Sequence, residues 1–229
     1  MKPLAAHVII LRRIDYGEAD RIITLLTDTF GKIRVMAKGV RKSKSKLAGG
    51  IELFSVSEIQ FIKGRSDIGT LVSTRMIKHY GNIVKDLERT ELAYAMLKSI
   101  DKTLEDDTGQ EYFIVLHESL AALDNLSINK VVAELSFAMR LLSLQGHVPD
   151  FTTDNAGNKL DPGTEYEFDF EHVAFRSVSG GPFDKNHLKV LKLLAYNSPQ
   201  KVIAVQGIGK YAEELVPLIR GLAGQYIPS

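Results

Sequence analysis

The chain has 229 residues, of which 45% are hydrophobic and 25% are charged, a composition that is ordinary for a globular protein of one or two domains. It contains no cysteine, which excludes disulfide bonds, thiol catalysis and zinc sites built from thiolates. No apolar run approaches the roughly 18 to 20 residues of a membrane span, and the first apolar stretch is too short for a signal peptide. We therefore expect a cytoplasmic protein.

The net charge of +1 conceals a strong asymmetry along the chain. Residues 1–85 hold 16 Lys and Arg against 7 Asp and Glu, whereas residues 86–229 hold 13 against 21. The net charges of the two parts therefore have opposite signs, at +9 for residues 1–85 and −8 for residues 86–229. This division predicts a basic front end that binds a polyanion and an acidic remainder with another task.

The first 80 residues carry the pattern of β-strands. Short runs rich in Val, Ile, Thr and Phe are separated by turn residues such as glycine. A sheet of five short strands with one apolar face must curl or be covered, so we predict a small closed or nearly closed barrel. The expected strands lie within residues 6–14, 19–31, 32–39, 54–64 and 68–80.

Seven positive charges fall between residues 32 and 46, and no negative charge follows until Glu52. Along the strand at 32–39 they alternate with apolar side chains, so we expect the basic row to lie opposite the core. Because a strand and its following loop carry all seven charges, they form one patch, which favours binding to a phosphate backbone over a merely solvated surface. Ser43 adds a hydroxyl that can contact phosphate oxygens.

A barrel that binds unpaired bases also needs flat side chains on which they stack. At strand spacing most aromatic residues are expected in the core, and the sequence does not single out one. The available residues are Tyr16, Phe30, Phe54, Phe61 and Tyr80.

Beyond residue 80 the apolar spacing becomes helical. Between the third and fourth helices, residues 147–181 are rich in loop-forming residues and contain an alternating stretch at 166–175, which predicts an insert with a hairpin. The expected helices lie within residues 82–104, 110–126, 129–147, 184–197 and 209–223.

Sequence signatures of enzymes are missing. The motifs of P-loop, dinucleotide-binding, zinc-protease and nucleophile-elbow sites do not occur. The six histidines are scattered, without the spacing of a metal site. We expect a protein with no catalytic residues, no metal and no other cofactor.

Residues 16–54 combine several features in a fixed order. A Gly-Glu pair precedes an apolar strand, and a later strand ends in Ala-Lys-Gly, followed by a basic run and then by a glycine and a phenylalanine. This stretch resembles the RecO family of bacterial DNA repair proteins. The matching positions are Gly17, Glu18, Thr27, Gly31, Ala37, Lys38, Gly39, Arg41, Lys42, Ser43, Lys44, Gly50 and Phe54.

The resemblance implies an α+β protein with a five-stranded OB-fold barrel in residues 1–80 and an α-helical bundle domain in residues 81–229. It implies a recombination mediator that binds single- and double-stranded DNA, anneals complementary strands without ATP and is not an enzyme. It also implies help in loading a recombinase onto DNA coated by single-stranded-DNA-binding protein. The implied protein partners are RecR and single-stranded-DNA-binding protein, and the implied location is the nucleoid, with no membrane.

Carried over position by position, the resemblance implies DNA contacts at Lys38, Arg41, Lys42 and Lys44, with Arg34 and Lys46 beside them. The complete set of predicted DNA-binding residues is Lys32, Arg34, Lys38, Arg41, Lys42, Ser43, Lys44 and Lys46.

In one segment the sequence departs from the family. Many RecO proteins hold zinc with four cysteines between the third helix and a Gly-Gly pair, whereas residues 147–181 contain no cysteine. We therefore expect a degenerate, cysteine-free version of that insert, held together by the apolar rows of its hairpin.

Two other functions remain open from the sequence. The first is an adaptor without catalytic activity, whose basic loop binds an acidic protein partner instead of DNA. The second is an enzyme that uses the carboxylates at 165–171, although no acid, base and pocket signature accompanies them.

Overall fold

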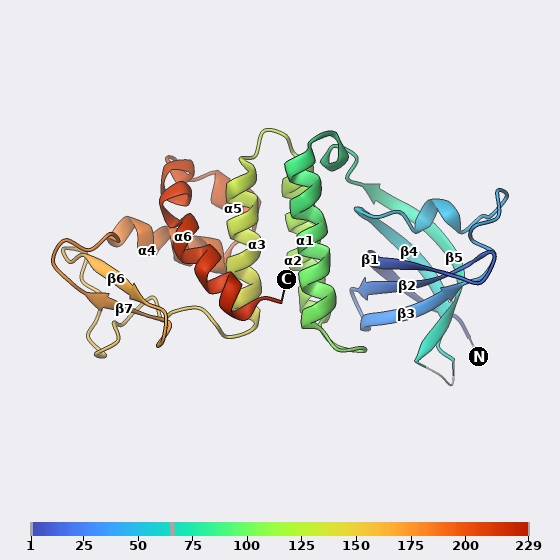
Figure 1. Cartoon of the computed structure of the whole chain (residues 1–229), viewed down its shortest axis with the longest axis horizontal. Coiled ribbons are helices and arrows are strands. Elements are labelled where there is room, and N and C mark those ends of the chain that lie inside the picture. Colours follow the sequence, from blue (N-terminus) through green and yellow to red (C-terminus); the bar gives the residue numbers. More distant parts are fainter. Residues whose placement is uncertain (1, 65–66, 229) are drawn as a thin grey trace. The chain divides into compact units, whose positions relative to one another are not determined.

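The computed structural model describes residues 2–64 and 67–228 (Figure 1). The chain divides into two compact units, one reaching to Asn125 and the other running from Leu126 to Pro228. The first unit contains five strands and the helices α1 and α2, and the second contains the remaining helices and a two-stranded sheet.

The first unit is built on a closed barrel with the strand order β1-β2-β3-β5-β4. The β3 and β5 strands pair in parallel, and the other neighbours pair antiparallel. This is the topology of the OB fold, so the predicted fold class is confirmed. The strands are β1 (Leu4–Tyr16), β2 (Asp20–Thr27), β3 (Gly31–Ala37), β4 (Ser55–Ile62) and β5 (Ile68–His79).

Alternating apolar residues of the strands fill the barrel. Each such side chain contributes about 1.5 to 3 kcal/mol when it is fully buried. Val40 and Ile51, from the segment between β3 and β4, join the same cluster and tie that segment to the barrel. The strand residues of the cluster include Val8, Ile10, Ile23, Leu25, Ile33, Val35, Ile59, Phe61 and Leu71.

Two helices cover part of the barrel wall. The 3-10 turn η2 (Ile83–Lys85) leads into α1 (Leu87–Thr103), whose N-terminus is capped by the Asp86 carboxylate accepting a hydrogen bond from the Arg89 N–H. Helix α1 packs on β1, and α2 (Gln110–Asp124) packs on β1, β2 and β3. The basic strand β3 therefore faces protein along part of its length.

The connection between α1 and α2 lies against the start of β3. The Lys32 N–H donates to the Thr108 carbonyl oxygen at 2.8 Å, and the Asp107 N–H donates to the Lys32 carbonyl oxygen at 2.7 Å. Gly31 has a φ of +69°, and a Cβ at this position would lie 2.2 Å from the Thr108 oxygen. The close approach of the two backbones depends on this glycine.

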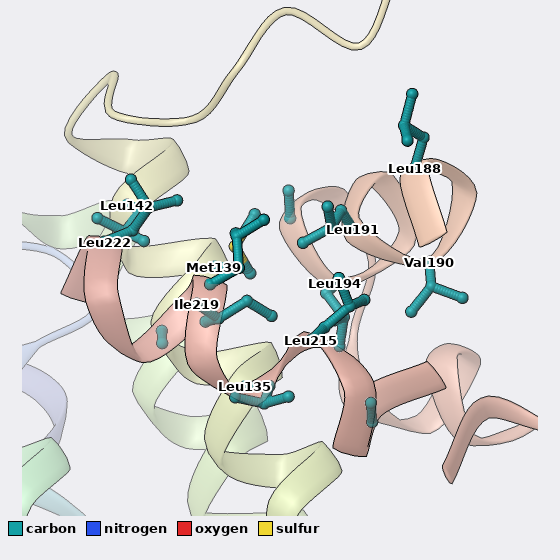
Figure 2. Packing of buried hydrophobic residues seen from close by; sticks show 14 of the residues in the cluster. Leu135, Met139, Leu142, Leu188, Val190, Leu191, Leu194, Leu215, Ile219 and Leu222 are labelled. Carbon is teal, nitrogen blue, oxygen red and sulfur yellow. The ribbon is translucent and has the colours of Figure 1, made fainter. Parts of the chain in front are cut away.

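The second unit has its own core, shown in Figure 2. Its elements are α3 (Lys130–Leu144), β6 (Tyr166–Asp169), β7 (Ala174–Ser177), α4 (Lys185–Tyr196), α5 (Pro199–Ile203) and α6 (Ile208–Tyr226). Helix α3 packs on both α4 and α6. The labelled side chains are Leu135, Met139 and Leu142 from α3, Leu188, Val190, Leu191 and Leu194 from α4, and Leu215, Ile219 and Leu222 from α6.

The cysteine-free insert is held by aromatic packing. Strands β6 and β7 form the expected hairpin, and it buries Tyr166 and Phe175 in the core of the second unit. Phe175 also meets Phe168 and Phe183 edge-to-face, with ring centroids 5.3 and 6.5 Å apart. Within the described residues, no three His, Asp or Glu side chains are grouped to hold a metal ion, so these residues do not fit the family's zinc site.

Two local features differ from the sequence-based expectation. The second strand ends at Thr27, four residues early, because the Thr27 hydroxyl accepts a hydrogen bond from the Phe30 N–H and forms a turn. The short helix α5 was not expected, and it begins with Pro199, a residue suited to the first helical turn.

None of the helices that the structure describes is long and apolar enough to cross a membrane.

We expect Gly31→Ala to destabilise the first unit by about 2 kcal/mol or more, because the left-handed backbone alone costs an alanine about 1 to 2 kcal/mol and the new Cβ displaces the α1–α2 connection. Chemical denaturation followed by circular dichroism measures the loss. Gly17→Ala, with a φ of +55° and open space around it, should lose only the backbone contribution, and Gly49→Ala should be close to neutral. Equal stability of all three variants would contradict this account.

Candidate nucleic-acid interface

The segment that carries most of the predicted DNA-binding residues follows β3, and residues 38–46 are called the basic loop below. Its first part is fixed to the turn between β1 and β2. The Gly39 N–H donates to the Asp20 carboxylate at 2.7 Å, and the Arg41 N–H donates to the Ala19 carbonyl oxygen at 2.9 Å. Between them the Val40 side chain is buried in the barrel.

The chain beyond the basic loop is fixed to the barrel as well. The Thr74 hydroxyl of β5 donates to the Leu47 carbonyl oxygen at 3.1 Å, just before the 3-10 turn η1 (Ala48–Gly50). Gly50 lies so close to Thr74 that a Cβ would come within 2.3 Å of its side chain. Phe54, buried at a φ of +55°, meets the Tyr94 ring of α1 edge-to-face at 5.0 Å. The lysines therefore project from a loop that is anchored at both ends.

The free positive charges of the loop are lysines. Lys38, Lys42, Lys44 and Lys46 are exposed, and no carboxylate of the described residues lies within ion-pair distance of them. Ser43 is exposed between them. Charges presented in this way are available to a phosphate backbone without first breaking an internal ion pair.

Arg41 has a different role from the lysines. Its Nε lies 3.4 Å from Asp15 Oδ2, and its Nη1 donates to the Gly17 carbonyl oxygen at 3.3 Å. Arg21 donates to the other Asp15 oxygen at 2.7 Å. This hydrogen bond from Arg21, together with the charge of Arg41, lowers the pKa of the Asp15 carboxyl. Asp15 thus stays ionised and orients Arg41 against the β1–β2 turn.

Lys32 and Arg34 lie apart from the basic loop, and their charges are matched within the protein. Lys32 is only 9% exposed, and its ammonium donates to the Asp101 carbonyl oxygen at 2.7 Å. Arg34 pairs with the Asp106 carboxylate at 2.7 Å. The alternation along β3 places these side chains opposite the core, as expected, but α1 and the α1–α2 connection cover that side of the strand.

The acidic charge of the chain is concentrated beside the barrel. Residues 86–125, which contain α1 and α2, hold 3 Lys and Arg against 10 Asp and Glu. Residues 126–229 hold 10 against 11 and are almost neutral. Further pairs join the two oppositely charged parts of the first unit, namely Arg12 with Asp101 at 3.2 Å and Lys63 with Asp107 at 2.8 Å. Most of the net negative charge of the acidic remainder, residues 86–229, therefore lies in residues 86–125.

The five aromatic residues considered for base stacking are not equally accessible. Phe54, Phe61 and Tyr80 are buried, and Phe30 packs edge-to-face on Phe61. Burial, with a smaller contribution from the Asp124 charge, raises the pKa of Tyr80 to about 12. Tyr16 is 55% exposed at the end of β1, next to the turn that holds Arg41. The spacing of these residues in the sequence does not show that Tyr16 is exposed while most of the others are buried.

Known proteins are similar in sequence to most of the chain. The family model "Recombination protein O N terminal" matches residues 1–80, and "Recombination protein O C terminal" matches residues 84–227. Proteins named "DNA repair protein RecO" include one from Desulfatibacillum aliphaticivorans, 34% identical over 65% of this chain, and one from Thermoanaerobacter sp. strain X514, 33% identical over 65%. A third, from Dehalococcoides mccartyi strain 195, is 30% identical over 93%.

The matched regions cover 59% and 60% of the lengths of the first two relatives and 87% of the third. The N-terminal family model ends where the barrel ends, and the C-terminal model includes α1 and α2, which pack on the barrel. With both models matched along nearly the whole sequence, the chain belongs to the RecO family.

Proposed function

We propose that this protein acts in DNA repair and recombination as a mediator that binds single- and double-stranded DNA through its basic loop. The observation that carries the proposal is the set of exposed, unpaired lysines at 38, 42, 44 and 46 on an anchored loop of an OB-fold barrel. Relatives along the chain are named DNA repair proteins, which supports the same role.

The same surface would favour annealing of complementary strands without ATP. Two strands repel because both are polyanions, and a surface that neutralises phosphates on each lowers the cost of bringing them together. Base pairing then supplies the driving force. Binding and charge neutralisation suffice for this activity, and we propose that the protein is not an enzyme.

We further propose that the protein helps to load a recombinase onto DNA coated by single-stranded-DNA-binding protein, together with RecR. The nearly neutral second unit, residues 126–229, would repel DNA little and attract it little, which leaves its surface for protein partners. Its DNA ligand would bring the protein to the nucleoid.

The alternative is an adaptor whose basic loop binds an acidic protein. High salt weakens both kinds of complex. Binding that increases with oligonucleotide length and is indifferent to sequence is expected only for DNA.

The loop lysines are tested by the triple variant Lys42→Glu, Lys44→Glu, Lys46→Glu in an annealing assay without ATP at several salt concentrations. We expect the native protein to accelerate annealing and salt to suppress it, and the variant to fail. Because three phosphate contacts are lost, the slope of log affinity for single strands against log salt should fall by about 2.

The matched control is Lys185→Glu, Lys189→Glu, Lys192→Glu on α4, which makes the same change in net charge at exposed lysines of the second unit. The control should anneal DNA nearly as well as the native protein. Equal loss in both triple variants would mean that total charge decides, and equal activity of the basic-loop variant and the native protein would favour the adaptor.

The ion pairs beside the barrel generate another prediction. Asp106→Asn with Asp107→Asn releases Arg34 and Lys63, so DNA affinity should rise and the salt slope for single strands should steepen by about 1.4. Asparagine tolerates the φ of +62° at position 107, so the loop is expected to keep its shape. A fluorescence anisotropy titration with a labelled oligonucleotide measures both quantities.

The control for this pair is Glu105→Gln with Glu111→Gln. It removes two exposed charges from the same region without freeing a basic residue of the barrel, since neither glutamate has an ion-pair partner among the described residues. A similar gain in affinity for both double variants would show that long-range charge, and not release of Arg34 and Lys63, is responsible.

A further inference from the structure

The outer surface of β1, β2 and β3 carries an exposed apolar row. Ile14 lies directly opposite Ile22 of β2, which in turn lies opposite Met36 of β3. Residues directly opposite on neighbouring strands share a face. The adjacent positions Ile23 and Val35 point into the barrel, so Ile14, Ile22 and Met36 point outward.

This row ends at an exposed ring. Tyr16 follows Ile14 by two positions on β1 and therefore lies on the same outer face. Tyr16 is 55% exposed and Ile14 is 44% exposed, while Ile22 and Met36 are partly exposed. We call the surface made by Ile14, Tyr16, Ile22 and Met36 the apolar face.

The apolar face lies between a row of ion-paired arginines and the unpaired lysines of the basic loop. One row deeper along the strands, Arg12 and Arg34 share the outer surface with Thr24, where their partners Asp101 and Asp106 belong to the helical cover. At the opposite side, β3 runs directly into Lys38 and the basic loop. The apolar face is thus the part of the strand surface left open between the helical cover and the lysines.

An exposed apolar surface next to unpaired lysines is complementary to single-stranded DNA, which has charged phosphates and unpaired bases. Its phosphates are anionic, and its unpaired bases have apolar faces that stack on aromatic and aliphatic side chains. A duplex offers the same phosphates but keeps its base faces stacked inside, and an acidic peptide would use the lysines without needing the apolar row.

We propose that the apolar face holds unpaired bases of single-stranded DNA, with Tyr16 as the stacking residue, while the basic loop holds the phosphates. The inference rests on the proposed function and adds to it the means by which single strands are told from duplexes. The lysines would contribute to binding of both forms, and the apolar face only to binding of single strands.

The chain contains no tryptophan, so a single introduced indole reports on this face directly. In the full-length Tyr16→Trp variant, titration with a single-stranded oligonucleotide of about 15 residues should quench the indole fluorescence, because bases stack on it. The duplex of the same sequence should leave the fluorescence largely unchanged, although it binds. The matched reporter is Tyr196→Trp on α4, a tyrosine 56% exposed in the second unit, which neither DNA should quench.

Affinity provides a second readout. Tyr16→Ser should weaken single-strand binding roughly tenfold, the effect of losing one stacked base, and change duplex binding less than twofold. Tyr196→Ser should change neither. Both serine variants replace exposed side chains, and their circular dichroism spectra are compared with that of the native protein.

Outcomes separate this inference from the function on which it rests. If single strands bind with the expected salt dependence but do not quench the Tyr16→Trp variant, or if the duplex quenches it equally, the apolar face does not hold bases and the inference fails while the basic loop stands. If no DNA binds to the native protein, the proposed function and the inference fail together, and an apolar partner protein becomes the occupant to test.

Discussion

The ion pairs between the barrel and the segment from Asp101 to Asp107 decide where free positive charge lies in the first unit. Lys32, Arg34 and Lys63 would otherwise extend the basic surface over β3 and the end of β4, but each meets an acidic residue of α1 or the α1–α2 connection. The carboxylates of this segment form ion pairs with these basic side chains, as DNA phosphates would. On the basic loop Lys38, Lys42, Lys44 and Lys46 keep their charges unpaired, so the helical cover narrows the basic surface that β3 and the end of β4 would otherwise add to them.

The basic loop, which carries these lysines, is held in place by hydrogen bonds and by contacts with the barrel core. Gly39 and Arg41 bond to the β1–β2 turn, Val40 and Ile51 enter the barrel core, and the Leu47 carbonyl accepts from β5. Because the loop is anchored before any ligand arrives, little backbone entropy is lost on binding. The lysine side chains are exposed, which suits a polyanion recognised by charge and not by sequence.

The fold and the basic loop could be predicted from the sequence because both rest on local patterns. The alternation of apolar and polar residues predicted the strands, and the lysines between Lys38 and Lys46 are exposed in the loop where the sequence places them. The pairing of Lys32 and Arg34 with Asp101 and Asp106 could not be predicted, because these partners lie some 70 positions away in the sequence. The periodicity of β3 does not reveal which element packs against it. The same holds for Tyr16: its exposure depends on where the helical cover ends, which is a tertiary property.

The paired backbones at Lys32 and Thr108 also close an edge of the sheet. The β5 strand reaches β3 only from Arg34 onward, so the N–H and carbonyl of Lys32 would face outward without the hydrogen bonds to Thr108 and Asp107. Unpaired strand edges are templates for another chain. By pairing with Lys32, the α1–α2 connection satisfies backbone groups that could otherwise bind a strand of another chain.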